Sequence, residues 1–429
     1  MNLTPSQTLR TLCAVFLVVA TVRGIFFSPV ASSVPQEDGV LVESTVLRVE
    51  VGVDRQKITL EDGLLAFIPR YPLVHYGDRV RLMCDMSSPE PFEGFAYDRY
   101  LAAKGIDRLC FTRKTPIVIG EDRGGVMMGT LQDWRAGVMA TIDLAYGEPH
   151  ASLLAGLLFG EKRFSDRWEQ LFIRTGTSHI VAASGYNVSM VMIISSFVLA
   201  TLGMRRRKAF GFLIAATVGY VLFAGFETAV IRAGVMGALV MTSYQVGRKT
   251  TMTNVLLLTA AIMLTINPRL LLDDAAFGLS FLSTIGLICL TPKWKISWTW
   301  IPERFLIRES LTSTLAATLM SFPILIFQFG KISLVSVFTN VLILPAVPFV
   351  MASGALSIFV SPLSVDIARL ASLPTVAGLN WMLWIVEKGA DLPLYFDVPA
   401  MLSVILFILW LILMKRIWTR SVLLKSFSV

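Results

Sequence analysis

Long segments without a charged side chain recur along the second half of the chain. The run from Ile180 to Leu202 has 23 uncharged residues, and the run from Ile332 to Val365 has 34. A helix needs roughly 17–25 residues to cross the hydrocarbon core of a bilayer, so these runs predict membrane-spanning helices. Only 16% of all residues are charged and the mean hydropathy is +0.67, whereas soluble domains average about 25% charged residues. We therefore expect a polytopic α-helical membrane protein.

About ten transmembrane helices are predicted, at residues 11–28, 179–202, 209–226, 229–246, 252–267, 275–291, 311–329, 335–360, 372–387 and 399–414. The first is interpreted as an uncleaved signal-anchor rather than a signal peptide, because no small-x-small cleavage site follows it. The chain then divides into that anchor (1–30), an external β domain (31–120), an amphipathic or re-entrant region (121–178), a transmembrane domain (179–415) and a basic cytoplasmic tail (416–429).

The positions of the basic residues predict the orientation of these spans. Cytoplasmic loops retain Lys and Arg, and 15 of the 19 basic residues after position 178 fall in four clusters or at Arg369; the clusters are 205–208, 248–249, 293–308 and 415–425. Both termini are therefore expected in the cytoplasm, with residues 31–178 outside. The net charge of +8 is mostly this orientation signal and does not by itself indicate nucleic-acid binding.

The external segment has the pattern of a small β domain. Runs rich in β-branched residues predict strands at 40–53, 56–61, 64–69, 79–86 and 108–112, with a short helix at 96–104. Turn signals such as Asp62-Gly63 and Gly77-Asp78 separate them. Five strands and one helix in about 80 residues suit a closed barrel of the OB type. We expect such a barrel outside the membrane.

Two features of this barrel bear on its function. Aromatic residues that could stack on bases are Phe67, Tyr71, Tyr76, Phe92, Phe95, Tyr97 and Tyr100. Residues 40–119 have no net charge, however, so core packing or contact with the membrane is the favoured interpretation. Cys84 and Cys110 lie in a compartment that permits a disulfide, but their spacing leaves open whether their Cβ atoms meet. Farther along, apolar stretches such as 151–159 are too short to span and are interpreted as re-entrant or interfacial.

Residues 178–187, with the sequence SHIVAASGYN, place polar groups at the start of a predicted span. Such groups within a bilayer cost free energy unless they face water or a partner. His179 is expected near the outer boundary, and Gly185 is a position where the helix bends or opens. Ser184 and Asn187, followed by Ser195, are spaced to form a thin polar stripe. This stripe predicts a hydrated path or a buried helix contact.

Two further features interrupt the apolar spans. Arg232 lies a few residues from the outer end of its span and either extends to the surface or faces inward. Thr339, Asn340, Pro345 and Pro348 interrupt the 34-residue run, which predicts either one tilted helix or a broken pair. Irregular backbone at membrane depth is tolerated only beside water or protein. The gap between broken helices is a reasonable place for a channel.

These residues carry a family resemblance. The motif at 178–187, preceded by Gly160-Glu161 and by residues 174–176, resembles the signature of ComEC-type competence proteins, inner-membrane channels that admit single-stranded DNA during natural transformation. Further similar segments follow in order, at residues 231–236, 247–248, 267–268, 274–281, 322–323 and 340–345, and residues 95–106 fit the external domain. The resemblance extends over about residues 1–415. It implies a DNA-path role for Arg174, Gly176, His179, Ser184, Gly185, Asn187, Arg232, Ser280, Asn340 and Pro345.

The chain departs from this family in two places. Tyr186-Asn187 replace the Leu-His that usually follows Ser-Gly, which argues against a required His there. Many members append a metallo-β-lactamase-like domain, and this chain has only three His residues and no cluster able to hold two metals. We therefore expect no catalytic residues, no metal and no cofactor. The expected partners are single-stranded DNA, the lipid bilayer, a separate DNA receptor, a nuclease and a cytoplasmic ATP-driven motor, since no GxxxxGK[ST] loop is present. Self-association is left open.

The same residues suggest two other classes of function, a solute carrier and an intramembrane protease. A membrane carrier for another solute would also use broken helices at mid-membrane, and it would carry an external β domain without a role in DNA binding. An intramembrane Ser/His protease is disfavoured, because five helical residues place His179 about 140° from Ser184 and no His follows it.

Overall fold

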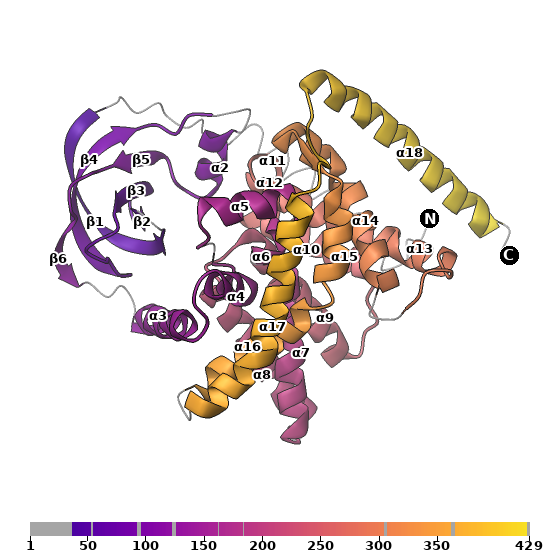
Figure 1. Cartoon of the computed structure of the whole chain (residues 1–429), viewed down its shortest axis with the longest axis horizontal. Helices are drawn as coiled ribbons and strands as arrows, with labels where there is room; N and C mark the ends of the chain where they lie inside the picture. The colour runs from indigo at the N-terminus through magenta and orange to yellow at the C-terminus, as the bar shows by residue number, and fades with distance from the viewer. Residues whose placement is uncertain are drawn as a thin grey trace.

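The computed structural model comprises a β-barrel beside a larger body of helices (Figure 1). It describes residues 37–426 apart from 53–54, 92–95, 122–125, 162, 183, 304–306 and 362–364. The predicted anchor at 1–30 therefore lies outside the described residues, as do Phe92 and Phe95. The small β-barrel and the helical body that the sequence predicted are both present.

Five strands close the barrel, and a sixth extends it. The strands are β1 (Glu37–Val51), β2 (Arg55–Leu60), β3 (Leu64–Pro69), β4 (Asp78–Ser87), β5 (Arg108–Phe111) and β6 (Ile117–Glu121). They are ordered β1-β2-β3-β5-β4-β6, and an additional β1–β4 pairing closes the ring. The β3–β5 pair is parallel, as the return of the chain through helix α2 (Tyr97–Ala103) requires. This is the OB-type topology that the strand pattern predicted; β6 was not expected.

A β-bulge lets the 15-residue strand β1 serve two partners. Its first part pairs with β4 as far as Thr45, and its second part pairs with β2 from Val46 onward, with a register shift between Val46 and Arg48. Bulges of this kind add twist and change the direction in which a side chain points. Val46 is fully buried in the barrel core, whereas Arg48 is only partly buried.

The barrel interior follows from the alternation of side chains along its strands. In β4 every second residue is buried, including Val80, Leu82 and Cys84. Cys84 and Cys110 form a disulfide that links β4 to β5, with their Cα atoms 5.1 Å apart. The Cys84–Cys110 disulfide, which the sequence left open, is therefore formed, and α2 lies between the two cysteines in the chain.

Three helices form the segment that the sequence predicted as amphipathic or re-entrant. They are α3 (Val126–Tyr146), α4 (His150–Phe159) and α5 (Asp166–Arg174). Helix α4 is buried from Ala151 to Leu158 and packs against α16 and α17 within the largest apolar cluster of the helical body. It is thus a core helix of the structure. Helix α5 is amphipathic, with Phe172 buried and Arg167 exposed.

The remaining helices make up the rest of the helical body. In chain order they are α6 (Ser178–Val181), α7 (Gly185–Thr201), α8 (Arg206–Phe223), α9 (Thr228–Val246), α10 (Met252–Ile266), α11 (Leu270–Asp273), α12 (Ala275–Cys289), α13 (Thr291–Ser297), α14 (Ile307–Ile324) with the π-helical turn η2 (Leu325–Phe329), α15 (Val335–Ile343), α16 (Val347–Val360), α17 (Val365–Ala390) and α18 (Ala400–Ser426). A short hairpin of β7 (Lys331–Ser333) and β8 (Tyr395–Asp397) lies among them.

Among the described residues, three helices are long and apolar enough to cross a membrane: Thr228–Val246, Ala275–Ser297 and Ile307–Phe329. A fourth span results if α15 and α16, which are bent by 47° at Pro345, are counted together. The interruption at 335–360 is therefore a broken pair. Shorter apolar helices, such as α7 and α10, add to this set. The number of about ten spans stays a prediction.

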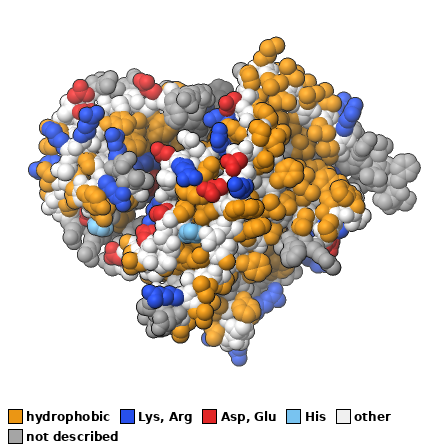
Figure 2. All heavy atoms as spheres, in the orientation of Figure 1, with side chains coloured by type: hydrophobic (Ala, Val, Ile, Leu, Met, Phe, Trp, Pro, Cys, Tyr) orange, Lys and Arg blue, Asp and Glu red, His pale blue; other side chains and the backbone are white. Residues whose placement is uncertain are grey.

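The surface of the helical body is largely apolar. Figure 2 shows hydrophobic side chains over most of this body, whereas charged ones lie over the barrel and along its boundary with the helices. Large apolar side chains that are more than 60% exposed include Phe197, Phe349, Phe359 and Leu370. Soluble proteins rarely expose so much contiguous apolar surface, so this is the surface of a membrane protein.

Candidate functional site

The motif at 178–187 does not form one continuous helix. Helix α6 ends at Val181, the backbone is extended at Ala182 and Ser184, and α7 begins at Gly185. The sequence predicted a single span from 179 to 202, so its first turns are corrected to a separate helix and a break. Ser184 is the N-cap residue of α7, and its hydroxyl donates to Asn187 Oδ1 at 3.1 Å.

Asn187 is the most buried polar residue of the motif, with 2% of its surface exposed. Its Oδ1 accepts from Ser184, and its amide faces the hydroxyl of Tyr220 on α8, although Nδ2 makes no hydrogen bond of ordinary geometry among the described residues. Buried amide groups in folded proteins are almost always hydrogen-bonded to protein or water. The Asn187 amide is thus a buried polar group between α7 and α8 whose donor capacity is not fully used.

The break before α7 brings Gly185 against Arg232 of α9. A Cβ atom added to Gly185 would lie 3.1 Å from Arg232 Nη2 and 3.2 Å from the Cβ of Ala233. A side chain at this position would require Arg232 or Ala233 to shift by a few tenths of an ångström. The structure thus gives Gly185 a packing role at this contact.

Arg232 reaches from α9 to α12. Its Nη1 donates to Thr284 Oγ1 at 2.7 Å, and its guanidinium carbon lies 5.9 Å from the centre of the Phe281 ring. Thr284 in turn donates to the carbonyl of Ser280 at 2.7 Å. Gly185, Arg232, Ser280, Phe281 and Thr284 therefore gather where α7, α9 and α12 meet, and we call them the arginine cluster.

A second group lies between the end of α5 and the start of α15. Thr175 and Thr177 share a hydrogen bond of 2.8 Å between their hydroxyls, and Thr339 donates to the carbonyl of Thr175 at 3.0 Å. All three are buried. Gly176 has a φ of +66°, and a Cβ there would lie 2.5 Å from that of Ser336. We call Thr175, Gly176, Thr177, Ser336 and Thr339 the threonine cluster.

The other predicted site residues lie around the threonine cluster. The Arg174 carbonyl accepts from Ser333 at 2.7 Å, and His179 Nδ1 lies 3.1 Å from the Gly176 carbonyl with its ring exposed. Asn340 is 4% exposed, and its Oδ1 has no partner among the described residues. Pro345 lies in the break between α15 and α16. Of the ten predicted residues, Gly185, Arg232 and Ser280 thus belong to the arginine cluster and Gly176 to the threonine cluster, whereas the other six lie near members of these clusters in the chain.

Thr284 was missed in the sequence, although a signal for it existed. It follows Ser280 by four residues and so lies on the same face of a helix. Threonine is common in apolar helices because it bonds back to its own backbone, so its type alone does not distinguish it. Phe281 lies within the segment 274–281 of the family resemblance, but nothing in the sequence indicates its contact with the Arg232 guanidinium.

The barrel is fastened to two loops of the helical body. Arg48 donates to the Gly225 carbonyl at 3.0 Å and pairs with Glu227 at 3.4 Å, between α8 and α9. Arg99 pairs with Asp273 at 2.7 Å, just before α12. Asn267 donates to the Ala103 carbonyl at 2.8 Å; Asn267 is half-buried and Ala103 is buried. These contacts place the barrel at the N-terminal ends of α9 and α12.

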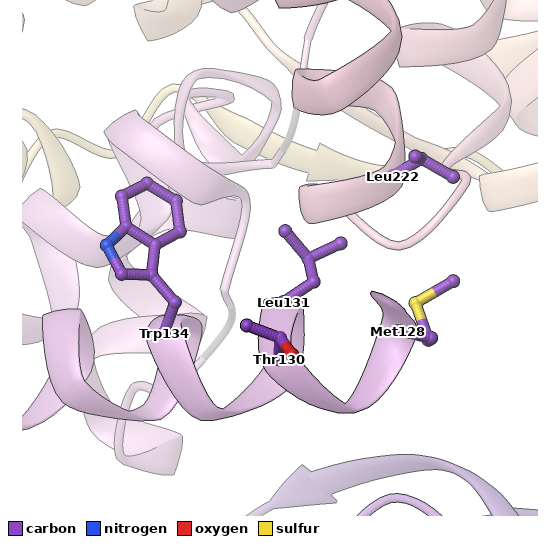
Figure 3. A pocket seen from close by; sticks show the side chains of 5 residues that line it. All are labelled: Met128, Thr130, Leu131, Trp134 and Leu222. Atoms are coloured by element: carbon purple, nitrogen blue, oxygen red, sulfur yellow. The ribbon is translucent and has the colours of Figure 1, made fainter. Parts of the chain in front are cut away.

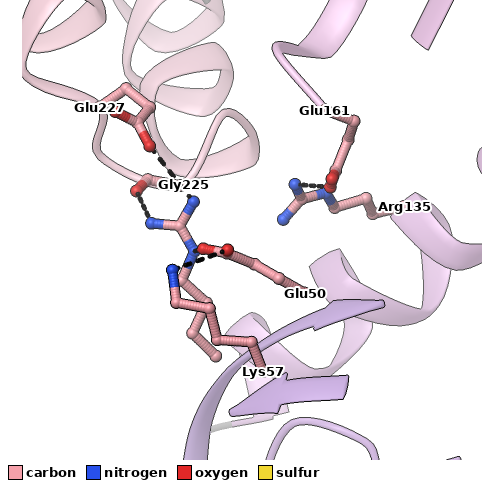
Figure 4. A network of polar contacts seen from close by, with 7 residues as sticks. Glu50, Lys57, Arg135, Glu161, Gly225 and Glu227 are labelled. Carbon is pink, nitrogen blue, oxygen red and sulfur yellow. Dashed lines mark hydrogen bonds and ion pairs between the residues drawn. The ribbon is translucent and has the colours of Figure 1, made fainter. Parts of the chain in front are cut away.

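Glu50 extends the contact at Arg48 into a network of charges, in which Glu50, Lys57, Gly225 and Glu227 lie near one another (Figure 4). Glu50 pairs with Arg48 at 3.2 Å and with Lys57 at 3.3 Å. Burial raises the pKa of the Glu50 carboxyl, but Lys57 and Arg48 together outweigh it, so that the pKa lies below the ordinary value of 4.5. Glu50 is thus an ionised member of the network at neutral pH.

An apolar pocket of about 430 Å³ lies between α3 and α8, apart from both clusters. Figure 3 shows the side chains that line it, which are Met128, Thr130, Leu131, Trp134 and Leu222. The Trp134 ring meets Phe223 edge-on, with ring centres 5.0 Å apart. The pocket contains no charged side chain and none of the predicted site residues.

Comparison with known proteins places these clusters in a family. A family model described as "Competence protein" matches residues 157–421, which include both clusters. The ComE operon protein 3 of Bacillus subtilis (strain 168) is 26% identical over 245 residues, which are 56% of this chain and 31% of that protein. The aligned part is thus about a third of the relative's length. No solved structure matches the chain. Because the family match includes more than half of its residues, this chain belongs to the Competence protein family.

Proposed function

We propose that the helical body forms a channel in the plasma membrane through which a single strand of DNA enters the cytoplasm during natural transformation. Membership of the Competence protein family supports a role in DNA uptake. The similarity to ComEC-type proteins in residues 174–187, which include three residues of the threonine cluster and Gly185 of the arginine cluster, supports the same role for the helical body. Residues 179–415 would then be the channel domain and residues 31–120 an external OB-like domain.

The observation that carries this proposal is a pair of unsatisfied amide atoms. Asn187 Nδ2 and Asn340 Oδ1 are both buried within apolar helices and make no hydrogen bond of ordinary geometry among the described residues, although the Tyr220 hydroxyl lies near Asn187. Each lies beside a break, Asn187 next to the 182–184 segment and Asn340 before Pro345. Polar groups and irregular backbone at membrane depth persist where they border water. A hydrated path past these two residues would satisfy both atoms, and a phosphate chain needs such a path.

The contacts of the barrel support an outside-to-inside orientation. The barrel contacts the helical body at 225–227 and 267–273. Along the chain these segments alternate with the exposed basic loops at 205–208 and 248–249. Because consecutive helices in a bilayer run in opposite directions, the barrel and the basic loops would lie on opposite sides. Basic loops belong in the cytoplasm. We therefore propose an external barrel, cytoplasmic termini and a cytoplasmic tail at 416–429.

The channel needs other proteins in this proposal. A separate receptor would deliver DNA to the barrel, a nuclease would provide the single strand, and an ATP-driven motor would pull it from the cytoplasmic side. The sequence contains no GxxxxGK[ST] loop, and among the described residues no three His, Cys, Asp or Glu side chains gather at a metal-binding distance. These observations support assigning the motor and the nuclease to partners.

Substitution of Ser184 or Asn187 by Leu tests the proposal. We expect either variant to insert normally but to abolish uptake of labelled DNA into the cytoplasm, because a branched apolar side chain closes the polar gap. Ser189→Leu is the matched control, since Ser189 lies on the same helix, is exposed and bonds only back to Gly185. Full uptake in correctly inserted Ser184→Leu and Asn187→Leu cells contradicts the proposal. Accumulation of a small solute without any dependence on DNA would favour the carrier function instead.

A further inference from the structure

The guanidinium of Arg232 lies among three helices without an acidic partner. Among the residues that the structure describes, no Asp or Glu forms an ion pair with it. Its neighbours are the hydroxyl of Thr284, the sulfur of Met236 at 3.5 Å and the ring of Phe281. All of these groups are neutral, so the positive charge is not compensated by the chain around it.

The hydrogen bonds of Arg232 are also incomplete. A guanidinium carries five N–H donors in a fixed planar fork. Nη1 is directed to Thr284 and Met236, whereas Nε is buried and has no partner in the described part of the chain. Arginine stays protonated under all ordinary conditions. A charged group with free donors in an apolar setting is costly unless an anion completes it.

The first turn of α7 lies close to the guanidinium. A Cβ atom added to Gly185 would lie 3.1 Å from Arg232 Nη2. The first turn of a helix presents backbone N–H groups that attract anions. Two kinds of donor, the guanidinium and these backbone groups, therefore lie near one another where α7 meets α9. The amide of Asn187, two residues farther along, faces Tyr220 of α8 instead.

We propose that Arg232 binds a phosphate group, with the first turn of α7 as its neighbour. The planar fork of arginine matches two phosphate oxygens, which neither Thr284 nor Phe281 does. This inference rests on the proposed function, in which the phosphate is a diester of the entering strand. The site then holds one phosphate at the outer end of the channel, since Arg232 is one turn from the barrel contact at Glu227.

A purely structural role for Arg232 makes a different prediction. A residue that only bridges α9 to α12 needs one donor, and its loss lowers stability without changing how binding depends on salt. A phosphate contact changes that dependence, because each contact on a single strand contributes about 0.7 to the slope of log affinity against log salt. The two roles are therefore separable by one titration series.

The test uses the full-length protein in phosphatidylcholine nanodiscs and a fluorescent oligodeoxythymidine. We expect Arg232→Gln to weaken binding by roughly tenfold or more and to reduce the salt slope by about 0.7. Arg232→Lys keeps the charge but loses the fork, so it should retain the slope and lose part of the affinity. The matched control is Arg163→Gln, because Arg163 is already paired with both oxygens of Asp143 at 3.0 Å; its slope should equal that of the native protein.

Other arms identify the source of the phosphate and protect the test against misfolding. An oligomer with an uncharged methylphosphonate backbone should bind the native protein and Arg232→Gln equally weakly. If Arg232→Gln does not fold, two measurements still test the inference: the affinity of the native protein for the two oligomers, and the salt slope and affinity of Arg232→Lys.

A salt slope and an affinity that are unchanged in Arg232→Gln overturn the inference but leave the channel proposal standing. Failure of the native protein to bind or admit any strand overturns the proposed function. A dependence on Arg232 seen only for phosphatidylglycerol nanodiscs assigns the phosphate to a lipid and overturns the strand contact.

Discussion

Arg232 Nη2 lies 3.1 Å from the position that a Cβ atom on Gly185 would occupy. Helix α7 thus approaches α9 at the break in the motif, and a Cβ atom at Gly185 would be closer to Arg232 than ordinary van der Waals packing allows. The two residues are 47 positions apart in the chain, so neither the motif nor the span around Arg232 reveals their contact. A small change at Gly185 is therefore a sensitive probe of the arginine cluster.

Gly185→Ala should reduce DNA uptake while the protein still inserts. The added methyl group displaces the guanidinium or separates α7 from α9, at a cost of about 1–3 kcal/mol for overpacking. Uptake of labelled DNA and thermal unfolding of the purified protein measure the two effects. Gly211→Ala on α8 is the control, because a Cβ there meets nothing within 4 Å. Equal uptake by both variants would show that the contact is irrelevant to transport.

Gly286→Ala should destabilise the helical body much more than Gly185→Ala. A Cβ at this position would lie 2.3 Å from the backbone oxygen of Ala316, so α12 and α14 must separate. Backbone cannot yield as a flexible side chain does, and the loss of unfolding free energy should exceed about 3 kcal/mol. The midpoint of thermal unfolding measures it, with Gly219→Ala, which meets nothing within 4 Å, as the control. A midpoint like that of the control would contradict the packing of α12 on α14.

The attachment of the barrel should weaken in acid. Since the pKa of Glu50 is lowered in the folded protein, its ionised form stabilises the network above pH 4.5, and this contribution is lost as the pH falls through the lowered pKa. Hydrogen exchange at 46–51 and 225–227 between pH 7 and pH 3 measures the loosening. Glu50→Gln should exchange faster at neutral pH and show a smaller change on acidification. An identical pH profile in Glu50→Gln would exclude Glu50 as the titrating group.

Loss of the disulfide should destabilise the barrel. The bond joins residues 26 positions apart, and cross-links of this size stabilise folded proteins by about 2–4 kcal/mol. Cys84→Ser and the reduced native protein should unfold at the same lowered temperature. Cys289→Ser, which removes a free thiol in α12, is the control and should leave the effect of reductant intact. A native protein whose stability does not respond to reductant would contradict this prediction.

The barrel was the part of the fold that the sequence predicted best. Its strands alternate buried and exposed residues over short distances, as β4 does from Asp78 onward, and Gly-containing turns separate them. The sixth strand, Ile117–Glu121, was missed because it follows Pro116 and is only five residues long. The disulfide depended on the fold of the barrel, so spacing alone left it open.

The helical body was predicted in kind but not in detail. Uncharged runs locate apolar helices but not their breaks; within the span at 179–202 only Gly185, where a bend was expected, indicated the break that precedes α7. The arginine cluster was also hidden, since Arg232 and Thr284 are 52 residues apart. Their contact depends on how α9 packs against α12. Periodicity along one helix contains no information about that packing.

The two attachments of the barrel have a mechanical consequence. Arg48 holds the loop that opens α9, and Arg99 holds Asp273 at the entrance to α12. These same two helices are joined farther in by the Arg232–Thr284 bond. Any rotation of the barrel relative to the helical body is therefore transmitted to α9 and α12 together, and it changes the geometry of the Arg232–Thr284 bond between them.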